Sequence, residues 1–124
     1  MDERLIAVTI TGPSATELSD LCHTVVTERL AACANITPIR SLYWWDGAVQ
    51  DQPEALAVLH TVDSAFQRLT ERVHELHPYD VPQVVALPLT AAQDYGTWIV
   101  RETTMSSARH SPEPSSQAEP GENP

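Results

Sequence analysis

The chain has 124 residues, and its seven basic residues, which are all arginine, stand against seventeen acidic ones, so the formal net charge at pH 7 is −10. Binding to nucleic acid or to an anionic membrane depends on clustered positive charge, and this composition therefore argues against both as partners. Metal cations are the more natural ligands of so acidic a chain.

Composition divides the chain into two parts. Residues 1–103 carry periodic apolar patterns and predict one domain, whereas Ser, Pro, Glu and Gly dominate residues 104–124, which we expect to form a disordered acidic tail. The first residues contain no basic region followed by a long apolar run, and no apolar run reaches membrane-spanning length. We therefore expect a cytoplasmic protein, in which Cys22 and Cys33 are reduced thiols.

The first two elements are predicted to be a strand and a helix. Residues 5–11 are β-branched and apolar enough for a buried strand, which Gly12 and Pro13 end. Ser14 and Glu17 have the spacing of a capping box, in which both side chains bind amides at the start of a helix. Apolar side chains then recur at near-helical spacing and are expected to face the core: Leu18, Leu21, Cys22, Val25 and Leu30.

A long hairpin follows. Residues 33–45 predict a second strand, in which Pro38 implies an edge or a bulge because proline donates no ladder hydrogen bond. Asp46-Gly47 is a strong signal for a two-residue hairpin turn. The third strand is expected to begin near Val49, to pass an irregularity at Pro53 and to continue to residue 61, and its apolar run suits a central position.

A second helix and a fourth strand are predicted after the hairpin. Ser64 and Gln67 again have capping-box spacing, and His77-Pro78 is expected to close the helix. Its apolar face is Phe66, Leu69, Val73 and Leu76. Residues 84–89 predict a strand at an edge of the sheet, because they contain Pro88.

A third helix is predicted near the end of the domain. Thr90 and Gln93 have the spacing of another capping box. The short helix that follows carries Tyr95, Trp98 and Ile99 on one side.

The order of elements predicts an α+β fold, the ferredoxin-like split βαβ sandwich with a long β-hairpin and an extra C-terminal helix. Two helices cover only one face of such a sheet. Tyr43 and Trp45 point to one side of the hairpin and Trp44 to the other, so both sides need cover. A soluble monomer rarely exposes an apolar patch of this kind, and we therefore expect association with further copies of the chain.

Three stretches resemble the signature sequences of the CutA family, the divalent-cation tolerance proteins. They are residues 29–35 (RLAACAN), 43–47 (YWWDG) and 77–82 (HPYDVP), in matching order and spacing. Glu54, Leu87-Pro88, Tyr95 and Trp98 also fall at expected positions. The resemblance covers residues 5–102 and implies a tight homotrimer, similar in architecture to the PII signalling proteins and held by the hairpins. Its interface residues are Tyr43, Trp44, Trp45, Asp46 and Gly47.

The resemblance also implies binding of copper and other divalent ions through a cysteine in the first strand and histidines before Pro-Tyr. This chain has Ile10 and Leu76 at two of those positions, and His60 where relatives usually carry lysine. The chain's own candidate metal ligands, for copper or zinc, are His77, His74, Asp80 and Cys33. His74 and His77 share the last helical turn, although the helix dipole also favours histidines there, and Cys33 also suits a buried structural position.

No Gly-rich phosphate loop, His-Glu-x-x-His motif or Gly-x-Ser-x-Gly elbow is present, so we expect a protein that is not an enzyme. The predicted function is that of a trimeric cytoplasmic divalent-cation tolerance protein. It would bind a divalent metal such as copper, with help from carboxylates near subunit boundaries: Asp46, Asp51, Glu54 and Asp80. Two alternatives stay open. One is a PII-like signalling module that binds a small molecule at inter-subunit clefts, and the other is a trimer that acts only as a scaffold.

Overall fold

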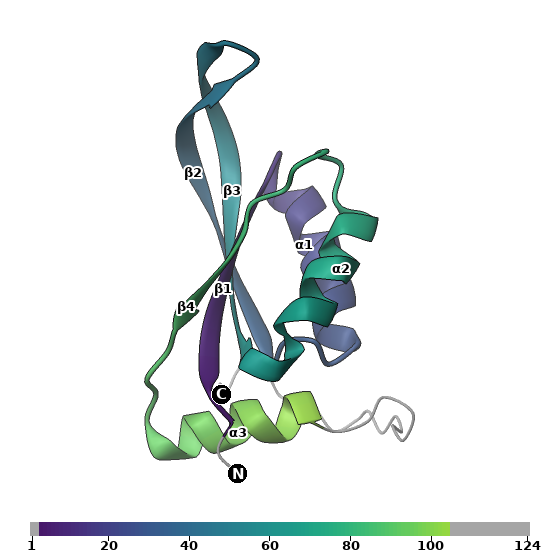
Figure 1. The fold of residues 1–124 in the computed structure, drawn as a ribbon, viewed down its shortest axis with the longest axis vertical. Helices are drawn as coiled ribbons and strands as arrows, with labels where there is room; N and C mark the ends of the chain where they lie inside the picture. Colours follow the sequence, from purple (N-terminus) through teal and green to yellow (C-terminus); the bar gives the residue numbers. More distant parts are fainter. Residues whose placement is uncertain (1–2, 105–124) are drawn as a thin grey trace.

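The computed structural model describes residues 3–104. Four strands form one antiparallel sheet in the order β2-β3-β1-β4, and three α-helices pack around it. The elements are β1 (Leu5–Gly12), α1 (Ala15–Thr27), β2 (Cys33–Trp45), β3 (Ala48–Val62), a 3₁₀ turn (Asp63–Ala65), α2 (Phe66–Leu76), β4 (Val84–Pro88) and α3 (Gln93–Thr104). The predicted ferredoxin-like fold is therefore confirmed (Figure 1).

The segment predicted to be a disordered tail lies outside the described residues, apart from Thr104, which ends α3. Within residues 3–104, no helix combines the length and the apolar character needed to cross a membrane.

The core lies between one face of the sheet and the helices α1 and α2. Every second residue of β1 is buried there, as the two-residue period of a strand requires. The residues of the core that come from strands and helices include Ile6, Val8, Ile10, Leu18, Leu21, Cys22, Val25, Ala57, Leu59, Leu69 and Val73. Both predicted apolar helix faces are thus confirmed as packing surfaces, and Phe66 and Leu76 lie partly buried at the margin.

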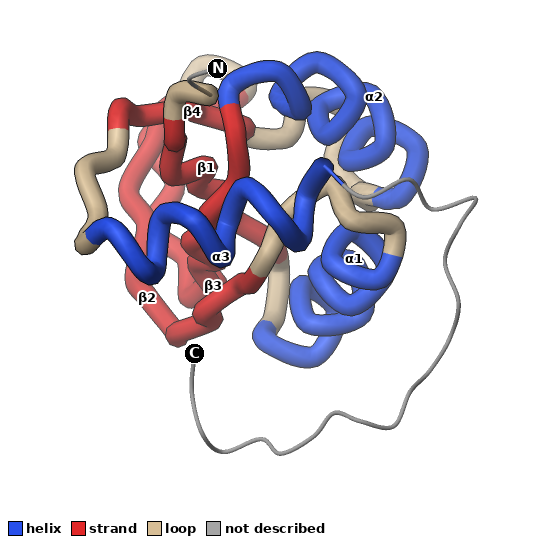
Figure 2. The backbone as a smooth tube through the Cα atoms, turned by 90° about the horizontal axis from the view of Figure 1, so that it is seen from below, coloured by secondary structure: helices blue, strands red, loops and turns tan. Residues whose placement is uncertain are grey.

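The opposite side of the sheet, which we call the open face, carries no such pair of helices (Figure 1). The side chains of β4 that point to it, Val85 and Leu87, are exposed. Only α3 crosses beneath the lower end of the sheet, as Figure 2 shows from below. Most of the open face is therefore uncovered in a single chain.

The hairpin of β2 and β3 is longer and more regular than the sequence predicted. Residue pairs run in unbroken register from Cys33 opposite His60 to Trp45 opposite Ala48. The bulge considered at Pro38 and the irregularity expected at Pro53 are therefore wrong. Pro38 lies on an edge strand, and both prolines occupy ordinary register positions, opposite Ala55 and Arg40. An edge strand has backbone N–H groups that need no ladder partner, which accommodates Pro38.

The turn of the hairpin has the predicted two residues. Asp46 has φ 57° and Gly47 has φ 81°, so both adopt the left-handed conformation of a type I′ turn. The twist of that turn matches the twist of the strands, which extends the hairpin well beyond α1 and α2 (Figure 1).

Of the three predicted capping boxes, the first forms in half: within residues 3–104 only the serine side of it makes its hydrogen bond. The Ser14 hydroxyl accepts from the Glu17 N–H at 3.2 Å. The Ser64 hydroxyl instead donates to the Glu3 carboxylate, and α2 begins at Phe66 without a side-chain cap. The third helix begins at Gln93 rather than just after Thr90. The Leu89 N–H pairs with the Leu5 carbonyl at 3.1 Å, so strand pairing continues one residue beyond β4.

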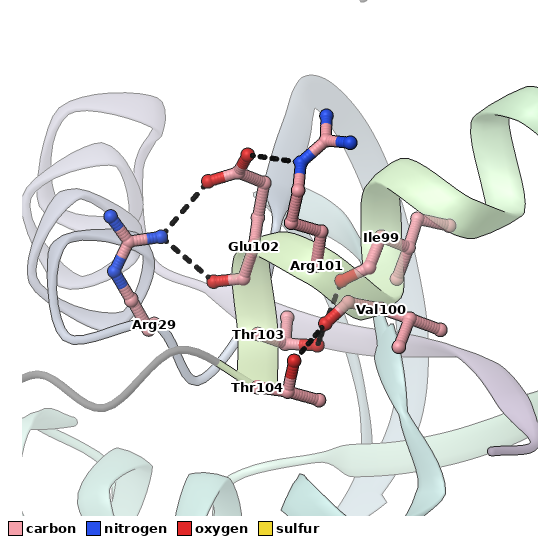
Figure 3. Close-up of polar contacts among 7 residues, drawn as sticks. All are labelled: Arg29, Ile99, Val100, Arg101, Glu102, Thr103 and Thr104. Atoms are coloured by element: carbon pink, nitrogen blue, oxygen red, sulfur yellow. Dashed lines mark hydrogen bonds and ion pairs between the residues drawn. The ribbon is translucent and has the colours of Figure 1, made fainter. Parts of the chain in front are cut away.

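An arginine joins the end of α1 to the end of α3. The Arg29 guanidinium donates from Nη1 to Oε1 of Glu102 at 2.9 Å and to the Glu102 carbonyl at 3.0 Å (Figure 3). Arg29 has φ 62°, and the N–H groups of Arg29 and Leu30 close the helix onto Val26 and Val25. This is a Schellman motif whose left-handed position, usually glycine, is occupied by arginine.

We predict that Arg29→Ala destabilises the protein more than Arg29→Gly. Both variants lose the contacts to Glu102, but glycine relieves the left-handed strain, which is worth about 1 kcal/mol. Urea unfolding at one fixed protein concentration measures the difference. If the alanine variant is as stable as the glycine variant, the left-handed conformation of Arg29 costs nothing.

Candidate functional site

A pocket of about 470 Å³ lies on the open face at the base of the hairpin. Strands β2 and β3 contribute Ser41, Tyr43, Trp45 and Glu54, and the loop between α2 and β4 contributes Tyr79 and Asp80. The same strand alternation that buries Ala55 and Ala57 against the helices directs Glu54 to the open face. Two carboxylates and three aromatic rings therefore line one pocket.

Glu54 is the buried acid of this pocket. It is 9% exposed, and its Oε2 accepts from the Tyr79 hydroxyl at 2.5 Å. Burial and the neighbouring Glu54 carboxylate raise the pKa of Tyr79, which therefore stays a hydrogen-bond donor. Tyr79 orients one oxygen of Glu54, and no hydrogen bond within residues 3–104 uses the other, Oε1.

Asp51, another acid of the hairpin, already forms an ion pair with an arginine. Arg40 on β2 donates to both of its carboxylate oxygens at 2.8 and 2.7 Å, and this pairing lowers the pKa of Asp51. Of the four carboxylates predicted to gather cations, Glu54 and Asp80 line the same pocket, whereas Asp51 faces Arg40 and Asp46 lies in the turn.

His77 is buried, and both of its ring nitrogens are in use. Nε2 lies 2.7 Å from the Thr11 carbonyl, which can only accept, and Nδ1 lies 3.1 Å from the Tyr79 N–H, which can only donate. The ring is therefore neutral with its proton on Nε2. A metal ion could bind His77 only if one of these two hydrogen bonds were lost.

The other predicted ligands lie apart from His77. His74 is exposed on α2 and pairs through Nδ1 with the Thr70 carbonyl at 2.9 Å. Asp80 lines the hairpin pocket, and Cys33 lies at the far end of the open face. Within residues 3–104, no three His, Cys, Asp or Glu side chains are grouped closely enough to hold a metal ion. Metal binding by His77, His74, Asp80 and Cys33 stays a prediction.

Cys33 belongs to a cluster that the sequence did not indicate as one. Its Sγ lies 3.2 Å from the hydroxyl of Tyr95 and 3.7 Å from Nδ1 of His60. The sequence did contain a signal for the contact between Cys33 and His60. Residues at equal distances from a hairpin turn face each other, and these two residues are such a pair. The contribution of Tyr95 from α3 has no comparable local signal.

The predicted interface residues lie at the tip of the hairpin. Trp44 is 73% exposed and Trp45 is 52% exposed, and Leu42 and Val49 beside them are exposed too. In a single chain this hairpin thus presents a large apolar surface on both of its sides.

We predict that His77→Ala lowers the free energy of unfolding by about 1–3 kcal/mol, because it leaves the Thr11 carbonyl and the Tyr79 N–H without their partners. His74→Ala removes an exposed ring and is the matched control, expected to change stability little. Urea unfolding in the presence of a metal chelator separates this effect from any bound ion. Equal stability of the two variants would contradict the structural role of His77.

Comparisons with known proteins agree with this fold. The family model for the CutA1 divalent ion tolerance protein matches residues 6–102. The divalent-cation tolerance protein CutA of Pyrococcus horikoshii is 37% identical over 100 residues, which are 80% of this chain and 98% of that protein. The chloroplastic CutA protein of Arabidopsis thaliana is 43% identical over 100 residues, and the match spans 79% of this chain and 55% of that longer protein.

Solved structures of the same family also resemble this chain. The CutA1 structure from Thermus thermophilus superposes with a TM-score of 0.77 at 42% identity, over 80% of this chain and 98% of that one. The matches in sequence and in structure cover nearly all of the described residues. The chain therefore belongs to the CutA1 divalent ion tolerance family.

Proposed function

We propose that this chain is a cytoplasmic, non-catalytic divalent-cation tolerance protein, which binds divalent cations such as copper as a homotrimer. The observation that carries the proposal is the pocket beneath the hairpin, where Glu54 and Asp80 lie beside Tyr43, Trp45 and Tyr79. This pocket places acidic ligands at the edge of the apolar surface through which copies of the chain would associate. A cation site and an interface thus share one region.

The exposed hairpin supports self-association. Trp44 and Trp45 are too exposed, and too close together, for an ordinary surface of a monomer. A ferredoxin-like sheet with helices on one face also leaves Val85 and Leu87 to be covered from outside. The trimer is the assembly that the family resemblance implies, and it would bury both surfaces.

The chemistry of the pocket supports cation binding. Glu54 offers Oε1, while Tyr79 holds the other oxygen, and Asp80 provides a second carboxylate from the adjacent loop. Two carboxylates are fewer than a divalent cation requires, so water or a second copy of the chain would complete the coordination. Copper(II) binds most tightly among the common divalent ions at sites with oxygen and nitrogen ligands.

Replacing Trp44 with Glu tests the assembly. We expect the wild-type chain to sediment with three times the mass of one chain, and Trp44→Glu to sediment with a smaller mass, because a charge would have to be buried in the interface. Thr97→Glu, an exposed position on α3, is the control with the same change of charge. A Trp44→Glu protein that keeps the wild-type mass would overturn the role of the hairpin.

A second experiment tests the cation site. Native mass spectrometry with Cu²⁺ or Zn²⁺ should show a fixed number of ions per chain, and Glu54→Gln combined with Asp80→Asn should weaken binding by on the order of tenfold or more. Asp51→Asn is the matched control, since Arg40 already neutralises that acid of the same hairpin. If Asp51→Asn causes an equal loss, or if the wild type binds no ion, the pocket is not the site.

A further inference from the structure

Two polar side chains at the base of the hairpin are buried but only partly used in hydrogen bonds. Thr11 on β1 is 8% exposed and Glu54 on β3 is 9% exposed. Within residues 3–104, Thr11 uses its backbone carbonyl, which accepts from His77, but not its hydroxyl, and Glu54 uses only Oε2. Buried polar groups are nearly always paired in native proteins, so the Thr11 hydroxyl and Glu54 Oε1 are available to a ligand.

Both atoms can be reached from solvent. Within residues 3–104, Oγ1 of Thr70 is the only unpaired side-chain atom that is fully shielded from solvent. Thr11 and Glu54 both line the pocket of about 470 Å³ on the open face, and this pocket is therefore where a ligand meets them.

Strand pairing brings these two side chains together. Thr11 lies opposite Leu56, and Glu54 is two residues from Leu56, on the same face of β3. Such diagonal neighbours in an antiparallel pair are roughly 7–8 Å apart, so one small polar group between their side chains can contact both. The two positions belong to paired strands rather than to a loop, which fixes their spacing.

The rest of the pocket is aromatic and apolar, and none of the described residues that line it is basic. The rings of Tyr43, Trp45 and Tyr79 line it together with the side chains of Leu42 and Val81. A positive charge is attracted to the face of an aromatic ring, and an apolar group gains by leaving water for such a surface. A metal ion gains little from three rings, whereas an organic cation can use both the rings and the carboxylate.

We propose that this pocket binds a primary alkylammonium ion that carries an aromatic or branched apolar group. The three N–H donors of the ammonium match atoms that can accept: Glu54 Oε1 and the hydroxyl oxygens of Thr11 and Ser41. A hydrogen bond between an ammonium and a carboxylate is about twice as strong as one between neutral groups. The volume of the pocket lies within the range of sites for small organic ligands.

The charges of the pocket also determine what it rejects. Glu54 and Asp80 repel a ligand carboxylate, and the lining offers no arginine to pair with one. The pocket should therefore prefer an amine to the amino acid with the same side chain. This inference rests on the proposed function only for the preference of the pocket for cations, and its further requirements are the N–H donors and the apolar group.

Isothermal titration calorimetry with 2-phenylethylamine tests the proposal on the full-length protein, in phosphate buffer with a metal chelator. We expect one molecule to bind per chain. Phenylalanine, 2-phenylethanol and the N,N,N-trimethyl derivative of the amine should each bind about tenfold or more weakly. The first adds a carboxylate, the second lacks the charge, and the third lacks the N–H donors.

Two variants test the proposed contacts. Glu54→Gln keeps the shape of the side chain but removes its charge, and it should weaken amine binding by about tenfold or more. Thr11→Val removes the unpaired hydroxyl and should weaken binding by about threefold or more. Thr9→Val is the matched control, because Thr9 lies two residues earlier on the same face of β1 and outside the pocket, and it should bind like the wild type.

Thermal unfolding of each variant checks that the fold is intact, and the ligand series on the wild type needs no variant. The proposal is overturned if the wild type does not bind the amine, if 2-phenylethanol binds equally well, or if Glu54→Gln leaves the affinity unchanged. Uptake of Cu²⁺ or Zn²⁺ without amine binding overturns this inference alone. Amine binding without metal uptake supports it and removes the proposed metal site.

Discussion

The unbroken ladder between β2 and β3 is the constraint on which the rest of the structure depends. Because no residue is inserted into either strand between Cys33 and His60, every side chain keeps the face that its distance from the Asp46-Gly47 turn assigns. The same register buries Ala57 and Leu59 beneath the helices and directs Glu54 and His60 to the open face. A slip of one residue would exchange those two sets of side chains.

Most of the fold could be predicted because its signals are local. Alternation, helical spacing and the Asp-Gly turn lie within short windows, and the order of elements follows from them. The predictions failed where a distant partner competed with a local one. Ser64 donates to Glu3, which lies just before β1, rather than capping its own helix. That partner is not visible within a window of a few residues.

The candidate sites were less predictable for the same reason. Spacing on one helical turn grouped His74 with His77, but the deciding contacts of His77 come from Thr11 and Tyr79, which occupy its two nitrogens. The position of the turn alone would pair Cys33 with His60, provided that the strands contain no bulge. Pro38 and Pro53 both suggested a bulge or an irregularity. Pro38 needs no bulge, because an edge strand tolerates a residue without a backbone N–H. Tyr95 required knowledge of how α3 docks.

The alternation of the hairpin aromatics also bears on the symmetry of the proposed assembly. Tyr43 and Trp45 lie on one side of the ribbon and Trp44 on the other, so a single flat contact leaves one side in water. A two-fold pair of ribbons gives each chain one self-complementary contact. Head-to-tail contacts around a closed ring give each chain two different neighbours, and a ribbon seated between them is covered on both sides. Because aromatic side chains lie on both sides of one hairpin, a closed ring of more than two chains would cover them better than a two-fold pair.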